Sequence, residues 1–225
     1  VWRFKTDNGF YSSPAIKGKY LLIGSQDYKF YCINTESGEK IWDYLTDGVV
    51  NSSPAIFEDF VYFGSNDGKV YCFEYKTGRK IWEFKTGGPV VSSPVISESG
   101  LLYIGSFDKV FYCLNAKTGE LIWNFETDSE IFSSPALFGD EVTFGTGDGS
   151  ILILKAKDGK GVRGLAGGDA ILSSPFVSRN EIIIGVCKYP YEGFLVSIKP
   201  LDEENYIDWI FNPFSKIYGS PAVTD

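Results

Sequence analysis

The sequence contains no histidine and no methionine among its 225 residues. Histidine is needed for Ser-His-Asp and Cys-His nucleophilic catalysis, and it is the usual general base near neutral pH. Enzymes of these classes, and His-liganded zinc sites, are therefore excluded for this chain acting alone. Because the chain begins with Val1 and has no initiator methionine, we expect it to be processed or to be a segment of a longer protein.

Long apolar runs and positive charge are also scarce. No apolar stretch approaches the roughly 18 residues that a membrane-spanning helix needs. The net charge is -8, whereas binding to a nucleic-acid backbone requires a basic patch. We therefore expect no membrane span and no nucleic-acid partner. The oligomeric state is left open.

A repeat that opens with Ser-Ser-Pro organises what is present. Successive copies are spaced by 40, 40, 41 and 40 residues, and they begin at Ser12, Ser52, Ser92, Ser133 and Ser173. Each copy holds four apolar segments of strand length separated by turn residues. Four-stranded units with a period of about 40 residues are typical of β-propeller blades. The sequence predicts an all-β protein, a β-propeller of four-stranded antiparallel blades.

The repeat also predicts the domain organisation. We expect one propeller domain or segment, 1–225, with full repeats at about 12–45, 52–85, 92–126, 133–165 and 173–211. Residues 1–5 match the fourth strand of a blade, and residues 219–225 match the first strand of another. Because unpaired sheet edges promote aggregation, we expect the chain to form part of a larger, closed propeller.

Two turns recur in the repeat. The turn between the second and third segments contains Asp27, Asp67, Asp108 and Asp148, and the turn between the third and fourth contains Gly38, Gly78, Gly119 and Gly159. Aspartate and a left-handed glycine are typical of hairpin turns. A ring of metal ligands is the alternative for the aspartates, but local turn formation explains each of them. The serine pairs are likewise interpreted as strand entries and not as nucleophiles.

Three of the four cysteines occupy one position of the repeat, ten residues before its tryptophan. These repeat cysteines are Cys32, Cys72 and Cys113, and Cys187 stands apart. Equivalent points on neighbouring blades are too far apart for a disulfide. We expect buried free thiols, which favour a reducing compartment. Without a Cys-x-x-Cys pair or histidine, we expect no metal site.

The third and fourth segments of the repeat resemble a known family. The stretches "KVYCFEYKTGRKIWEF", "KFYCINTESGEKIWDY" and "KVFYCLNAKTGELIWNF" are similar to the pyrroloquinoline-quinone-type propeller repeat. The resemblance implies up to eight blades. It also implies that the repeat tryptophans dock against the neighbouring blade, and their positions here are Trp2, Trp42, Trp82, Trp123 and Trp209. Arg163 replaces the tryptophan in the fourth repeat, which predicts a looser interface there.

The resemblance implies two classes of function. Quinoprotein dehydrogenases with this repeat hold the quinone and calcium, often beside an adjacent cysteine pair, which this chain lacks. We expect neither pyrroloquinoline quinone nor calcium, and no catalytic residue. Other members are scaffolds of outer-membrane protein assembly or cell-surface propellers. The leading hypothesis is a non-catalytic scaffold with a protein partner in a periplasmic or cell-surface setting. A quinone-dependent dehydrogenase fragment, or a segment that only covers sheet edges, are the alternatives.

The repeat is least regular after residue 155. A lengthened hairpin there contains Tyr189, Pro190 and Tyr191, and Arg163 lies in a glycine-rich stretch. Exposed tyrosines beside a rigid turn make good interface anchors. We therefore predict these four residues as a binding site, with decay of the repeat as the alternative.

Overall fold

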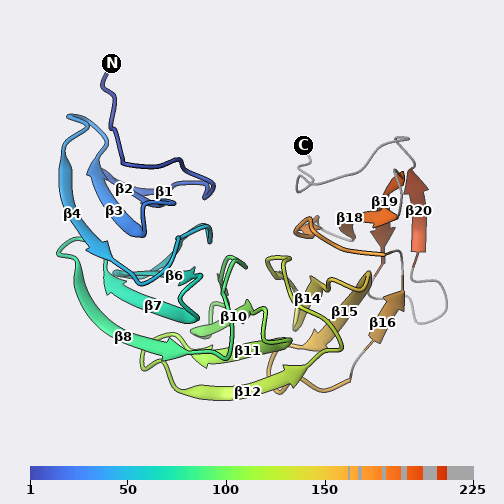
Figure 1. Cartoon of the computed structure of the whole chain (residues 1–225). Coiled ribbons are helices and arrows are strands. Elements are labelled where there is room, and N and C mark those ends of the chain that lie inside the picture. The colour runs from blue at the N-terminus through green and yellow to red at the C-terminus, as the bar shows by residue number, and fades with distance from the viewer. Residues whose placement is uncertain (162, 167–168, 179–180, 189–191, 200–206, 212–225) are drawn as a thin grey trace. The chain divides into compact units, whose positions relative to one another are not determined.

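The computed structural model describes residues 1–161, 163–166, 169–178, 181–188, 192–199 and 207–211. Strands, turns and loops make up this part of the chain, and it contains no helix (Figure 1). The strands form five four-stranded antiparallel sheets, and in each of them the strands follow one another in chain order. This confirms the predicted all-β fold and the four-stranded blade. Since the described residues form no helix, they offer none that could cross a membrane.

Each sheet corresponds to one copy of the repeat. The first contains β1 (Ala15–Lys17), β2 (Tyr20–Gly24), β3 (Lys29–Asn34) and β4 (Lys40–Leu45). The second contains β5 (Ala55–Phe57), β6 (Phe60–Ser65), β7 (Lys69–Glu74) and β8 (Arg79–Lys85). The third contains β9 (Val95–Ile96), β10 (Leu101–Gly105), β11 (Val110–Asn115) and β12 (Leu121–Glu126).

The last two sheets follow the same plan. The fourth contains β13 (Ala136–Phe138), β14 (Glu141–Gly145), β15 (Ser150–Lys155) and β16 (Arg163–Ala166). The fifth contains β17 (Phe176–Val177), β18 (Ile182–Lys188), β19 (Glu192–Ile198) and β20 (Ile207–Phe211).

The turn chemistry follows the sequence. The four repeat glycines between the third and fourth strands have φ values between +70° and +76°, the left-handed region that favours glycine. The position after the turn aspartate is also left-handed, in Gly68 and Gly149 but equally in Tyr28 and Lys109. A side chain at φ +69° is uncommon outside glycine. The hairpin geometry therefore overrides residue preference at those two positions.

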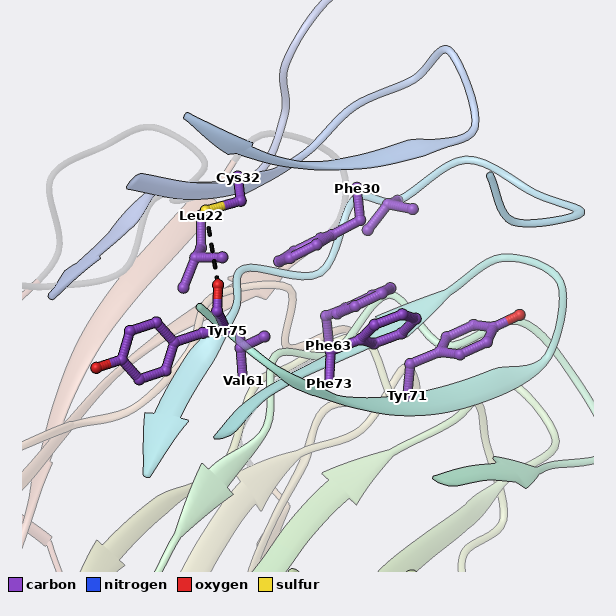
Figure 2. Packing of buried hydrophobic residues seen from close by; sticks show 9 residues of the cluster. Leu22, Phe30, Cys32, Val61, Phe63, Tyr71, Phe73 and Tyr75 are labelled. Atoms are coloured by element: carbon purple, nitrogen blue, oxygen red, sulfur yellow. Dashed lines mark hydrogen bonds between the residues drawn. The ribbon is translucent and has the colours of Figure 1, made fainter. Parts of the chain in front are cut away.

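The chain divides into two compact units, Val1–Asp108 with Tyr112–Ile122, and Lys109–Phe111 with Trp123–Asp225. Within the first unit, one apolar cluster joins side chains of the first and second sheets (Figure 2). The rings of Phe30 and Phe63 stack at its centre, with centroids 3.9 Å apart. The second unit has a comparable stack of Phe111 on Phe144, also at 3.9 Å. Stacked aromatic rings thus pack sheet against sheet in both units.

Aliphatic side chains pack the fourth sheet against the fifth. The cluster contains Ile151, Ile153, Ile171, Ile182, Ile184, Val186, Val196 and Ile198. Whether the replacement of tryptophan by Arg163 loosens this interface stays a prediction, because that side chain is outside what the structure describes.

The two predicted partial strands have different outcomes. Residues 1–5 belong to no strand in this structure, although Trp2 packs as the other repeat tryptophans do. Within the part of the chain that the structure describes, no strand pairs with them. Residues 219–225 lie outside the described residues.

Candidate functional site

A tryptophan and a glycine form the joint between consecutive repeats. The indole N–H of Trp42 donates to the Tyr75 carbonyl at 2.9 Å, and its ring covers Gly78. A Cβ added at Gly78 would lie 2.7 Å from Trp42 Cγ, so only glycine fits. The same arrangement recurs in the pairs Trp2 and Gly38, Trp82 and Gly119, and Trp123 and Gly159.

This joint agrees with what the family resemblance implies for Trp42, Trp82 and Trp123. The sequence showed the glycine as a turn residue but not as the contact surface of the preceding tryptophan. The signal was present, because each tryptophan precedes the glycine that it covers by 36 residues in three of the pairs and by 37 residues in the pair Trp82 and Gly119. The Trp209 side chain lies outside the described part of the structure.

The turn aspartates bind more than their own turn. Asp67 accepts the hydroxyl of Tyr71 at 2.7 Å and the backbone N–H of Asp47 at 3.1 Å, both on Oδ2. Its Oδ1 accepts the Lys69 N–H. Hydrogen bonds from Tyr to Asp also join Tyr31 to Asp27 and Tyr112 to Asp108. Burial, followed by the bond to Asp67, raises the pKa of Tyr71 above its ordinary value. These tyrosines therefore act as neutral donors.

Asp148 is the exception among the four turn aspartates. In its repeat the tyrosine position is Leu152, and Asp148 instead accepts the Thr146 hydroxyl at 2.5 Å. The hydrogen bond from Thr146 lowers the pKa of this carboxyl.

The serine pairs connect strands and repeats. The first serine of a pair binds within its own sheet, as when Ser52 Oγ accepts the Gly64 N–H at 3.0 Å. The second serine binds across sheets, since the Ser13 N–H donates to Ser53 Oγ and the Ser53 N–H to Ser93 Oγ. The serine pairs therefore serve as structural connectors at the strand entries.

The thiols of all four cysteines are buried. Burial raises the pKa of each repeat cysteine to about 12. The Cys32 thiol also donates to the Tyr75 carbonyl at 3.7 Å (Figure 2). Because reactivity requires the thiolate, burial and the raised pKa disfavour reaction of the three repeat cysteines.

That the chain binds neither pyrroloquinoline quinone nor calcium stays a prediction. No group of three or more His, Cys, Asp or Glu side chains within the described part of the chain could hold a metal ion. The carboxylates that recur in the repeat, Asp27 and Asp67 among them, already accept hydroxyl and backbone N–H donors. A hard cation such as calcium needs six to eight oxygen ligands.

The predicted binding residues are not brought together by the described structure. Tyr189, Pro190 and Tyr191 lie outside the described residues, between β18 and β19. Arg163 begins β16 and its backbone pairs with Ile153. Its side chain is outside the described part of the structure, so the site stays a prediction.

A hollow of about 330 Å³ lies in the first unit beside Ala116, and we refer to it as the Ala116 hollow. It is lined by Phe57, Glu58, Phe60, Tyr62, Glu98, Ser99, Gly100, Asn115, Ala116, Lys117 and Thr118. Ala116 occupies the position that holds Tyr75 in the preceding repeat. Aligning the repeats could have found this difference, but the missing volume appears only when the neighbouring sheet is in place.

Three comparisons place the chain among known proteins. A search of the curated proteins found no match. Among solved structures, the chain is similar to BamB from Moraxella catarrhalis, with a TM-score of 0.74 and 15% sequence identity. The match covers 92% of this chain and 63% of the BamB chain, and at that identity the likeness concerns the fold. A family model described as "Beta-alanine-activating enzyme, beta-propeller" matches residues 1–225. The chain therefore belongs to this family of pyrroloquinoline-quinone-type β-propellers.

Proposed function

We propose that this chain is a non-catalytic β-propeller scaffold that binds a protein partner. The observation that carries the proposal is that the recurring polar groups of the chain serve structural roles. Serine hydroxyls, turn aspartates and tyrosine hydroxyls form hydrogen bonds that hold strands and repeats together, and the repeat cysteines are buried. Because these polar side chains serve to maintain a rigid frame, we assign recognition of the partner to the loops at the surface of the propeller.

The family description names an enzyme, and the match is to its propeller. We propose that the propeller contributes binding and that it contains no catalytic residue. The likeness to BamB and the resemblance of the repeat to scaffold propellers support this role. They also support a periplasmic or cell-surface setting, which we propose together with it.

We propose Tyr189, Pro190, Tyr191 and Arg163 as the contact residues. The hairpin interrupts a regular repeat with two tyrosines beside a proline, and tyrosine is enriched among the residues that dominate binding energy. A rigid frame beneath it would reduce the entropy lost when the partner binds.

Capture of the partner from an extract of the source cells tests this function. The immobilised chain is compared with the double variant Tyr189→Ala and Tyr191→Ala, with captured proteins identified by mass spectrometry. We expect the variant to lose at least tenfold of one specific partner. The matched control replaces two exposed tyrosines elsewhere, Tyr11 and Tyr28, by alanine. Equal recovery by the hairpin variant and the wild-type chain would show that the hairpin is not the site.

A titration with pyrroloquinoline quinone and calcium tests the absence of enzymatic function. We expect no change in the absorption spectrum of the quinone and no shift in the melting temperature of the chain. A saturable spectral change would contradict the scaffold proposal and support the dehydrogenase alternative.

A further inference from the structure

We propose that the Ala116 hollow binds a segment of a partner protein that inserts an aromatic side chain and carries an arginine or lysine beside it. The inference rests on the proposed function, because it specifies one surface through which a scaffold would recognise its partner. It does not involve the Tyr189 hairpin.

The neighbouring interface shows what the site accommodates. Between the first and second sheets, the Tyr75 ring meets the Tyr20 ring edge to face, with centroids 5.3 Å apart and planes at 74°. The ammonium groups of Lys17 and Lys76 lie 5.5 and 5.4 Å from the centroid of the Tyr75 ring. Tyr75 is only 4% exposed. Edge-to-face packing and cation–π contacts both stabilise a ring in such a position.

Most of this environment recurs one repeat later, between the second and third sheets. Phe60 takes the position of Tyr20, and Lys117 takes the position of Lys76. Both line the hollow, as does Phe57 in the place of Lys17. The ring between them is missing, because Ala116 replaces Tyr75. The hollow therefore retains two walls that suit an aromatic ring, and it lacks the ring.

The hollow is large enough to hold an aromatic side chain. Its volume of about 330 Å³ lies at the lower end of the roughly 300–1,000 Å³ range of ligand pockets. An inserted aromatic ring would be removed from water by Phe57 and Phe60, and aromatic side chains supply the largest apolar contact area of any residue type. The hollow therefore has room for an aromatic anchor.

The charge at the rim selects the neighbour of that ring. Two exposed carboxylates, Glu58 and Glu98, line the hollow against one ammonium group, that of Lys117. The Glu58 carbonyl accepts a hydrogen bond from Lys17 Nζ at 2.5 Å, which holds this turn to the first sheet. A cation next to the inserted ring would meet negative potential from both carboxylates, and the net charge of the chain is -8. Complementary charge thus favours an arginine or lysine in the partner.

A peptide titration tests the proposal without the natural partner. The probe is the blocked peptide Gly-Arg-Tyr-Arg-Gly, followed by the amide NMR signals of Gly100 and Ala116 in the whole chain. Two control peptides replace the tyrosine by alanine or both arginines by glutamate. We expect saturable shifts at these amides with the probe, and at least tenfold weaker binding of each control peptide. Equal binding of the alanine peptide would overturn the proposal.

Two variants of the chain complete the test. Ala116→Tyr fills the hollow with a ring of the chain's own, as Tyr75 does in the preceding interface, and should weaken the probe at least tenfold. Glu98→Lys changes only an exposed side chain, so it keeps the test decisive if the first variant does not fold. It should weaken the probe several-fold, whereas the same charge change at the exposed Glu36, in a turn of the first sheet, should not.

Unchanged affinity in either hollow variant would overturn the inference. That result leaves the proposed function standing, because partner capture by the Tyr189 hairpin is measured separately. Equal capture by the hairpin variant and the wild-type chain, with normal probe binding at the hollow, would refute the hairpin site and leave this inference standing.

Discussion

Replacement of Gly78 by alanine is the sharpest test of how consecutive repeats are joined. The glycine has φ +73°, and a side chain in left-handed backbone costs about 1–2 kcal/mol. The added Cβ would also lie 2.7 Å from Trp42 Cγ and Cδ2. Such overpacking costs about 1–3 kcal/mol. We expect Gly78→Ala to lower the free energy of unfolding by about 2–5 kcal/mol.

Gly100 provides the matched control. Its φ is +78°, but an added Cβ would meet no atom within 4 Å. Gly100→Ala should therefore cost only the backbone strain, about 1–2 kcal/mol. Urea unfolding followed by circular dichroism measures both variants without relying on tryptophan fluorescence.

A double-mutant cycle isolates the contact between the two side chains. In a Trp42→Ala background the steric overlap disappears, so Gly78→Ala should cost no more than Gly100→Ala does. The coupling energy should equal the overpacking cost, about 1–3 kcal/mol. Equal costs of Gly78→Ala in both backgrounds would refute the reasoning that Trp42 requires the glycine.

Three further predictions concern the polar groups of the frame. The repeat cysteines have pKa values of about 12, which gives a thiolate fraction of about 10⁻⁴ at pH 8. Iodoacetamide should therefore label them only after urea unfolding. Labelling of these three cysteines in the native protein, detected by mass spectrometry, would contradict this. Tyr71→Phe should lower the free energy of unfolding by about 1.5–3 kcal/mol, because it removes a hydrogen bond to a charged group. The control Tyr11→Phe, at an exposed site, should leave the free energy of unfolding almost unchanged. Equal unfolding midpoints of the two variants in urea would contradict this. The hydrogen bond from Thr146 lowers the pKa of Asp148, so its stabilisation should be full above about pH 4 and be lost as the pH falls through the folded-state pKa. Urea midpoints between pH 6 and pH 2 should fall less steeply for Asp148→Asn than for the wild-type chain, and parallel curves would exclude the effect.

Much of the fold could be predicted because its cause is local and repeated. The turn after each third strand requires a left-handed residue, and the sequence supplies glycine at Gly38, Gly78, Gly119 and Gly159. The strands of each blade are joined by short hairpins, so neighbours in sequence are neighbours in the sheet. The irregular hairpin at Tyr189 could be recognised from the same repeat, but its contacts depend on side chains outside the described structure.

Contacts between repeats were less accessible to prediction. Asp67 was explained from the sequence as a turn former, and the structure adds the Tyr71 hydroxyl and the Asp47 N–H as donors to the same carboxylate. The Asp47 bond spans 20 residues, so turn preference alone contains no information about it. The burial of the Cys32 thiol beside the Tyr75 carbonyl likewise depends on the neighbouring sheet.

The all-β fold, the four-stranded blade, the turn positions and the absence of histidine chemistry could all be deduced from the amino-acid sequence. These follow from residue type and spacing, because hairpin turns and strand periodicity are local properties of the chain. The packing of neighbouring sheets was needed to show why the repeat glycine must be glycine, and that Ala116 leaves a hollow at the position that Tyr75 fills in the preceding repeat. Both depend on a side chain contributed by the neighbouring sheet, and steric fit between sheets is set by atoms that are about 40 residues apart in the sequence.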